Sequence, residues 1–282
     1  MYNSLVILAI CATLLPSLVR PAACKPKKAA IGPPALVKLE HVRRLVLDPG
    51  HGGDNLGALG TAGIREKALT LEASKNIAIW LRSQCDVEVL LTRERDVAVE
   101  LRQRPRLAND WKADALVSVH ANAHEQAEAS GMEVFYLAAD ASAEAARQLV
   151  EREEGAGAGG PAAGQPWTVD GIKTDMALAA AHARSQAFAL AMGEALQSIR
   201  KKVRFRGVRQ AAFGVLKEAQ MPALVLELGY ITHVDEGPKL FDVAVHAEFA
   251  KALLQALVEL DRRLAAELKI KRNKDKALAT KK

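Results

Sequence analysis

Four residues of this chain are of the types that hold and use a metal ion, and each stands where a strand should end or a helix begin. His51, His120 and Glu227 come directly after, or at the end of, short apolar runs, and Glu66 stands at the start of a helical stretch. An open parallel sheet presents its ligands outside the carboxyl ends of its strands, so we expect these side chains at one sheet edge. Two imidazoles and one carboxylate suit a catalytic Zn²⁺, which keeps a fourth position for water, and a further carboxylate can move protons.

Each of these residues has an ordinary structural explanation when it is taken alone. Glu66 in a first helical turn is a typical capping acid, because the helix dipole favours a carboxylate there. His120 alone is more often a hydrogen-bonded core histidine than a ligand. On one edge of one sheet, however, the four residues together favour a metal site. The glycine-rich loop 50–63 around His51 would let the backbone approach an ion closely.

The elements that must position these residues alternate along the chain. Short apolar runs predict strands over 44–48, 87–92, 115–119, 132–137, 213–216 and 223–227. Apolar residues spaced three and four apart predict helices over 65–82, 101–111, 138–150, 175–198 and 249–268. This order predicts a single α/β domain over residues 44–268, with a mostly parallel central sheet and helices on both faces.

Charge is concentrated at the two ends of the chain. The 282 residues carry a formal net charge of +6, and residues 269–282 alone hold seven basic residues and one acid. Four more basic residues lie within 20–28, which leaves residues 29–268 at about −4 by the same counting. We therefore expect 269–282 to be a basic disordered tail. Binding of nucleic acid through that tail is disfavoured, since such binding needs basic residues clustered on a folded face.

The N-terminal segment predicts export to the periplasm or cell envelope. Residues 5–19 form an apolar run of 15 residues, the length of a signal-peptide core, and small residues follow it up to Cys24. Residues 1–24 are thus expected to be a signal peptide and residues 25–43 a linker. Basic residues follow the run rather than precede it, which argues the other way. Cys24 after two alanines also resembles a lipoprotein processing site, so a lipid anchor is the alternative to simple cleavage.

The segments around the four residues resemble those of the zinc-dependent N-acetylmuramoyl-L-alanine amidases, over roughly residues 44–260 and in that family's order. The resemblance implies that His51, Glu66 and His120 are the zinc ligands and that Glu227 is the catalytic acid and base. It also covers Thr92-Arg93 and Arg104, which we interpret as structural. The matching segments are Asp48-Pro49-Gly50-His51-Gly52-Gly53, Glu66-Lys67, Ser118-Val119-His120-Ala121-Asn122 and Pro222-Ala223-Leu224-Val225-Leu226-Glu227-Leu228-Gly229-Tyr230.

The resemblance further implies a substrate, a role and a means of control. The substrate would be peptidoglycan, cut at the amide between the lactyl group of N-acetylmuramic acid and L-alanine, in wall remodelling or daughter-cell separation. Septal members carry a helical insert that covers the zinc site until an activator protein withdraws it. Residues 138–185 have a comparable length, with Glu153 or Glu154 as the preferred blocking residue. The alternative is an acidic surface loop without a regulatory role.

Two departures from the family pattern lie near the site. Asn55-Leu56 stand where Asp-Pro is usual, and His233 replaces an asparagine after the last strand. Both leave the four key residues intact, and both are expected to alter substrate fit or the contacts behind the ligands. Two other functions stay open on the sequence alone: another zinc peptidase acting on wall peptides, and a non-catalytic wall-binding protein.

Overall fold

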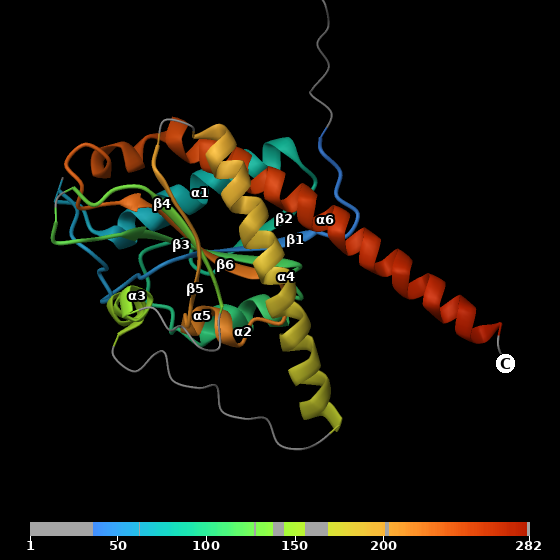
Figure 1. Ribbon diagram of the computed structural model, residues 1–282. Coiled ribbons are helices and arrows are strands. Elements are labelled where there is room, and N and C mark those ends of the chain that lie inside the picture. Colours follow the sequence, from blue (N-terminus) through green and yellow to red (C-terminus); the bar gives the residue numbers. More distant parts are fainter. Residues whose placement is uncertain are drawn as a thin grey trace, which may run out of the picture. The chain divides into compact units, whose positions relative to one another are not determined.

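The computed structural model describes residues 36–61, 63–126, 128–137, 144–155, 169–200 and 203–280, all within the compact unit Ala35–Lys282 (Figure 1). The predicted signal peptide and lipoprotein site lie outside the described residues. In chain order, the elements are β1 (Arg44–Pro49), α1 (Glu66–Gln84), β2 (Glu88–Leu91), α2 (Gln103–Asp110), β3 (Ala115–Asn122), β4 (Met132–Leu137), α3 (Glu144–Glu154), α4 (Val169–Ile199), β5 (Phe205–Ala211), α5 (Gly214–Lys217), β6 (Ala223–Tyr230), the 3₁₀ helix η1 (Gly237–Phe241) and α6 (Val243–Ala279).

The strands form one sheet in the order β2-β1-β3-β6-β4-β5. Neighbouring strands among β2, β1, β3 and β6 are parallel. β4 runs antiparallel to β6, and the edge strand β5 runs parallel to β4. The predicted α/β domain with a mostly parallel sheet is confirmed. The carboxyl ends of β1, β3 and β6 therefore meet at one edge, and β4 begins at that same edge.

Side chains alternate between the two faces of the sheet, and each face has its own helices. Leu45, Leu47 and Val117 pack with residues of α1, α4 and α6. Val46 and Leu116 point to the opposite face, where they pack with residues of α2, α3 and α5. We call this second face the site face, because the alternation also places on it the polar residues Asp48, Ser118, His120, Glu133 and Glu227.

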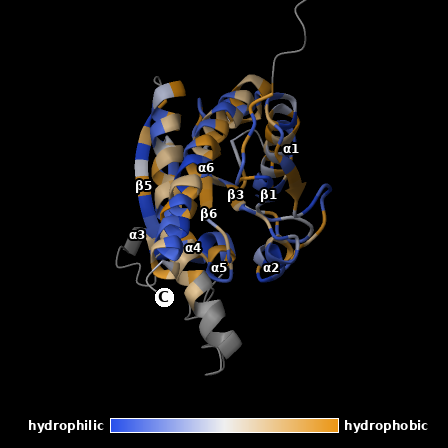
Figure 2. Ribbon diagram, turned by 90° about the vertical axis from the view of Figure 1, so that its right-hand side faces the viewer, coloured by the Kyte–Doolittle hydropathy of each residue, from blue (hydrophilic) through white to orange (hydrophobic). Residues whose placement is uncertain are grey.

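One edge strand differs from the sequence prediction. The run 213–216, predicted to be a strand, forms the short helix α5, and the unpredicted strand β5 (Phe205–Ala211) precedes it. A short apolar run cannot by itself distinguish a strand from a buried helical turn. β5 has no apolar run, since its edge position leaves most of its residues partly or fully exposed. Figure 2 shows β5 largely blue, in contrast to the central strand β6.

Both ends of the described chain are more ordered than predicted. α6 continues to Ala279, so the prediction of a disordered tail from residue 269 is wrong as far as residue 280. These residues are exposed, but they extend a helix that is already nucleated and contain neither glycine nor proline. At the other end, Val37 pairs with Cys85, and Leu39 and Val42 are buried, so the predicted linker packs on the domain from residue 36 onward. Among the described helices, none has the length and apolar character to cross a membrane.

The expected insert consists of two helices as far as it is described. α3 begins at Glu144 and ends at Glu154, later than the predicted 138–150. Residues 138–143 and the glycine run within 156–168 lie outside the described residues. α4 includes the whole of the predicted helix 175–198 and begins earlier, at Val169.

Candidate metal centre

His51 leaves the end of β1 in a backbone conformation that is uncommon for a residue with a side chain. Its φ is +62°, in the left-handed region. Arg104 holds this turn, because its Nη1 donates to the Pro49 carbonyl and its Nη2 to the His51 carbonyl, both at 2.9 Å. The ring Nδ1 of His51 lies 2.9 Å from Asn55 Oδ1. An N–H at Nδ1 satisfies this contact and leaves the Nε2 lone pair for a metal.

A buried carboxylate, Asp48, fixes this arginine in turn. Its Oδ1 accepts from Arg104 Nη1 at 2.7 Å and from Thr92 Oγ1 at 2.5 Å, and its Oδ2 accepts from Ser118 Oγ at 2.6 Å. Burial works to raise the pKa of Asp48, but the charge of Arg104 and the three hydrogen bonds outweigh it and lower that pKa. The His51 turn thus rests on an ionised, hydrogen-bonded pair inside the site face.

Glu66 is the first residue of α1 and is 1% exposed. Backbone N–H groups hold both its oxygens, because Ala121 donates to Oε1 and Ala58 to Oε2, each at 3.0 Å. The Arg93 guanidinium joins this helix start to the loop that follows β1, since its Nη2 donates to the carbonyls of Gly50 (2.7 Å) and Lys67 (2.8 Å). The two segments that carry His51 and Glu66 are therefore fixed relative to each other.

His120 lies on β3, on the site face, with its ring against the backbone of Gly50. A Cβ at residue 50 would come within 2.4–2.7 Å of three atoms of the His120 ring, so a larger residue there would displace the histidine. The His120 and His51 rings meet edge to face, with centroids 4.9 Å apart. The imidazoles are thereby directed at a common point.

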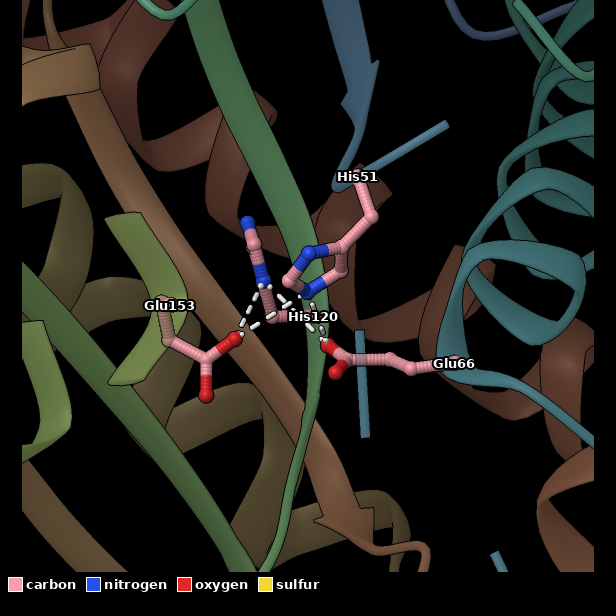
Figure 3. Close-up of side chains that lie close together, drawn as sticks. All are labelled: His51, Glu66, His120 and Glu153. Atoms are coloured by element: carbon pink, nitrogen blue, oxygen red, sulfur yellow. Dashed lines mark hydrogen bonds and ion pairs between the residues drawn. The ribbon is translucent and has the colours of Figure 1, made fainter. Parts of the chain in front are cut away.

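The structure brings His51, Glu66 and His120 together and adds a fourth group, Glu153 of α3 (Figure 3). Glu66 Oε1 lies 3.0 Å from His51 Nε2 and 3.3 Å from His120 Nδ1. Glu153 Oε2 lies 3.1 Å and 3.2 Å from the same two nitrogens. Tetrahedral ligands about 2.05 Å from a zinc ion would be about 3.3 Å apart. The donor set and its spacing fit a tetrahedral zinc ion.

Residues on either side of Glu153 attach α3 to the domain. Arg152 donates from Nη1 to the Ala123 carbonyl and from Nη2 to Asn122 Oδ1, both at 2.6 Å. Glu154, the other acid considered from the sequence, accepts from the backbone N–H groups of Gly214 (2.7 Å) and Val215 (3.1 Å) at the start of α5. Glu154 is thus an anchor of α3 and stands apart from the cluster.

The two carboxylates of the cluster favour the protonated forms of its two histidines. Burial lowers the pKa of His51, but the hydrogen bonds with Glu153 and Glu66 outweigh it and raise that pKa to about 9. The pKa of His120 is also raised, against its burial, by the same two carboxylates. A metal cation would take the place of these protons, and its binding would release them.

Glu227 stands beside the cluster without joining it. It faces His120 in the β3–β6 register, is fully buried, and neither of its carboxylate oxygens has a hydrogen-bond partner among the described residues. Burial raises its pKa well above the ordinary value, and the negative charge of Glu153 raises it further. A buried carboxylate with both oxygens unpaired is suited to accept a proton from a ligand that enters the site.

Some residues near the site were not identified from the sequence, and others have local roles. Asn55, noted as a departure from the family pattern, contacts the His51 ring. Arg152 had no sequence signal as an anchor. His233 accepts hydrogen bonds from the backbone of Asp235 and Glu236 within its own turn. His246 contacts Asn76 and the Leu240 carbonyl, far along the chain from the ligands.

Comparison with known proteins points to one family of enzymes. The family model described as N-acetylmuramoyl-L-alanine amidase matches residues 45–259. AmiC of Escherichia coli O6:H1 is 31% identical over 215 residues, which cover 76% of this chain and 51% of AmiC. AmiA of Escherichia coli K12 is 31% identical over 219 residues, which cover 77% of this chain and 75% of AmiA. The chain thus spans about half the length of the AmiC relative.

Solved structures of such amidases share the fold. The catalytic domain of CwlV from Bacillus (Paenibacillus) polymyxa var. colistinus has a TM-score of 0.58 at 26% identity, covering 77% of this chain and 97% of that one. AmiC2 of Nostoc punctiforme has a TM-score of 0.57 at 26% identity, covering 77% and 96%. Because the family model matches residues 45–259, a span that includes all four candidate residues and most of the domain, this chain belongs to the N-acetylmuramoyl-L-alanine amidase family.

Proposed function

We propose that this chain hydrolyses the amide between the lactyl group of N-acetylmuramic acid and L-alanine in peptidoglycan, with zinc held by His51, Glu66 and His120. The observation that carries the proposal is the convergence of these three side chains beside an unpaired buried glutamate, within a domain of the amidase family. The names of AmiC and AmiA state the same activity for those relatives. Wall remodelling or daughter-cell separation is the role that such an activity would serve.

The chain's own residues would divide the chemistry between them. Bound zinc would supply a water whose pKa is lowered to about 7, and it would polarise the scissile carbonyl. Glu227 would accept the proton of the attacking water and deliver it to the departing alanine nitrogen, since an amine leaves poorly unless it is protonated. The buried position of Glu227 suits it to carry that proton, because burial favours the protonated form between the two transfers.

In the described arrangement, we further propose, α3 inhibits the enzyme. Glu153 lies where a fourth zinc ligand would stand, the position that a catalytic site reserves for water. Its backbone is held in place by the contacts of Arg152 and Glu154. An activator protein that withdrew α3 would free this position, so such a partner is proposed together with peptidoglycan.

Digestion of purified wall sacculi tests the activity. An amidase frees L-alanine amino termini and leaves the glycan strands intact, whereas a carboxypeptidase frees amino acids from the peptide carboxyl ends. We expect new L-alanine termini, together with about one zinc ion per chain by elemental analysis. Zinc-loaded chain that binds sacculi without releasing any product would instead support a non-catalytic wall-binding protein.

Export is proposed because the substrate lies outside the cytoplasmic membrane. The apolar run of residues 5–19 and the small residues before Cys24 support it at the level of sequence. Terminal sequencing of chain recovered from the cell envelope should begin near Cys24. Intact Met1 on chain recovered from the cytoplasm would count against export, and labelled lipid on Cys24 would support the lipid anchor.

A further inference from the structure

The site face carries a row of charged residues that continues beyond the metal centre toward the sheet edge. His120 on β3 faces Glu227 on β6, and Glu227 faces Glu133 on β4. The next and last strand is β5 (Figure 1). Glu133 is only 3% exposed, and the proposed chemistry does not use it. A buried carboxylate needs partners, and those of Glu133 identify what this part of the site can bind.

Glu133 has two hydrogen-bond donors and two arginine ion-pair partners around it. Asn122 Nδ2 lies 3.0 Å and the Tyr230 hydroxyl 3.3 Å from its Oε2. Arg209 Nε lies 3.1 Å and Arg206 Nε 3.4 Å from its Oε1. Two guanidinium groups share one carboxylate, so the group carries a net positive charge.

A bulge in β5 directs both arginines to the same carboxylate. Met132 pairs with Phe205 and Glu133 with Gly207, so Arg206 is an extra residue in β5. Gly207 at this bulge has a φ of +120°, which glycine adopts without strain. Without the bulge, residues 206 and 209 would point to opposite faces of the sheet. Bulges near active sites commonly redirect a side chain in this way.

Both guanidinium groups keep donors for a further partner. The Arg206 side chain is 24% exposed and that of Arg209 is 44% exposed, while Glu133 beneath them is buried. Their ion pairs with Glu133 are through Nε. Among the described residues, Arg206 Nε has no hydrogen-bond partner, and neither arginine has a hydrogen bond or ion pair from its terminal Nη atoms. An arginine that faces a buried carboxylate with Nε keeps its terminal N–H groups in the fork that fits a further carboxylate.

We propose that Arg206 and Arg209 form a carboxylate-binding subsite for the acidic residue that follows L-alanine in the stem peptide. This inference rests on the proposed function. Adjacent strands are about 4.8 Å apart, and an extended residue spans about 3.3–3.6 Å, so a group at Glu133 lies about one residue beyond a bond cut beside Glu227. The muramoyl side of that bond has no ionised group, since its lactyl carboxyl forms the amide. The peptide side supplies the carboxylate.

Two matched substrates test the subsite: N-acetylmuramoyl-L-alanyl-D-glutamate and N-acetylmuramoyl-L-alanyl-D-isoglutamine, which differ in one free carboxylate. Because α3 contacts β5, both are assayed with the full zinc-loaded chain and with its Glu153→Ala variant. We expect kcat/KM to favour the free acid about tenfold, the effect of roughly one charge-assisted hydrogen bond. In Arg206→Gln/Arg209→Gln this ratio should fall to about one.

Two controls separate recognition from general effects of charge or folding. Arg262→Gln/Arg263→Gln removes the same two charges from the exposed surface of α6 and should keep the tenfold ratio. Arg209→Lys keeps the charge and should keep part of the preference. Equal rates on both substrates in the unmodified chain, or an unchanged preference in the double variant, would overturn the subsite.

The proposed function and the subsite can fail separately. If neither substrate is cleaved in either chain, the proposed function fails. The subsite is then decided by calorimetric binding of L-alanyl-D-glutamate against L-alanyl-D-isoglutamine to the Glu153→Ala variant. Tighter binding of the free acid that is lost in the double variant supports the subsite, and equal binding overturns it.

Discussion

Two buried glutamates at the same edge of the sheet have opposite surroundings, and this difference separates their roles. Glu66 is contacted by two backbone N–H groups and by two histidines, which lower its pKa in spite of its burial. Glu227 has no hydrogen-bond partner among the described residues, and its pKa is raised. Environments that separate the pKa values of two carboxylates in this way suit them to different chemical tasks. Glu66 is suited to remain an ionised ligand and Glu227 to exchange a proton.

Glu227→Gln should keep the zinc content and the fold while kcat falls about 10²–10⁴-fold. The substitution preserves the size of the side chain and removes the proton acceptor. Release of L-alanine termini from sacculi measures the rate, and elemental analysis measures the zinc. A variant that works at close to the unmodified rate would show that the proton acceptor is another group.

Asp48→Asn should lower the free energy of unfolding by about 3 kcal/mol at neutral pH, because Arg104 is left buried without its counter-charge. The pKa of Asp48 in the folded chain is below the ordinary value of 3.8, so its stabilising effect is complete above that value and is lost as the pH falls through the folded pKa. Urea unfolding at several pH values should therefore give a difference in the free energy of unfolding between the two chains, and this difference should shrink below about pH 4. A difference independent of pH would contradict the assignment.

At the scale of elements, the proposed inhibition assigns to α3 the position that would decide whether the site is open. It contributes a carboxylate to the cluster, its polar anchors lie at its last turn, and Ala146, Leu149 and Val150 pack in the core of the site face. The other ligands come from the loop after β1, from α1 and from β3, so withdrawal of α3 would expose its apolar residues but would leave the elements that carry those ligands in place. The inhibitory role proposed for Glu153 follows from this separation.

Glu153→Ala should raise the basal rate of wall digestion about tenfold or more, because water can then take the fourth position. Arg152→Ala should also raise the basal rate, since it removes two hydrogen bonds that hold α3. Glu151→Ala is the matched control: it removes an exposed acid from the same helix and should change little. Equal rates for all three variants and the unmodified chain would leave α3 without an inhibitory role.

The elements that sequence could predict are those with strong apolar patterns. β1, β3 and β6 are buried along their length, and α1 repeats its apolar face regularly. β5 has neither property, so it was missed, and its arginines with it. The extent of α6 beyond residue 268 was missed because a run of lysines predicts disorder by composition, although such residues are good helix formers.

At the scale of the whole molecule, the candidate ligands could be predicted because each follows a buried strand or begins a helix within a recognisable motif. The contacts that orient them could not. Arg152 reaches Ala123 and Asn122 only through the fold, and the contact of Asn55 with His51 depends on the shape of the loop between them. Glu153 could be predicted in part. The sequence shows the insert and its acidic residues, but the choice between Glu153 and Glu154 depends on the position of α3.

Removal of zinc should destabilise the whole domain, since the ligands come from four elements far apart in the chain. An ion at about 1,000 times its dissociation constant contributes about 4 kcal/mol, or roughly 10 °C in Tm for a domain of this size. Calorimetry with and without a chelator measures this shift. His120→Ala should lose both the zinc and the shift. Full zinc occupancy in that variant would refute the ligand assignment.

The docked position of Glu153 has a consequence for metal retention. With α3 in place, the cluster offers four protein ligands, as a structural zinc site does, whereas a catalytic site has three. The resting chain would then be a storage form that keeps its ion in metal-poor surroundings, and the same movement that starts catalysis would make the ion easier to lose. A short active life after withdrawal of α3 would limit how much wall each molecule cuts.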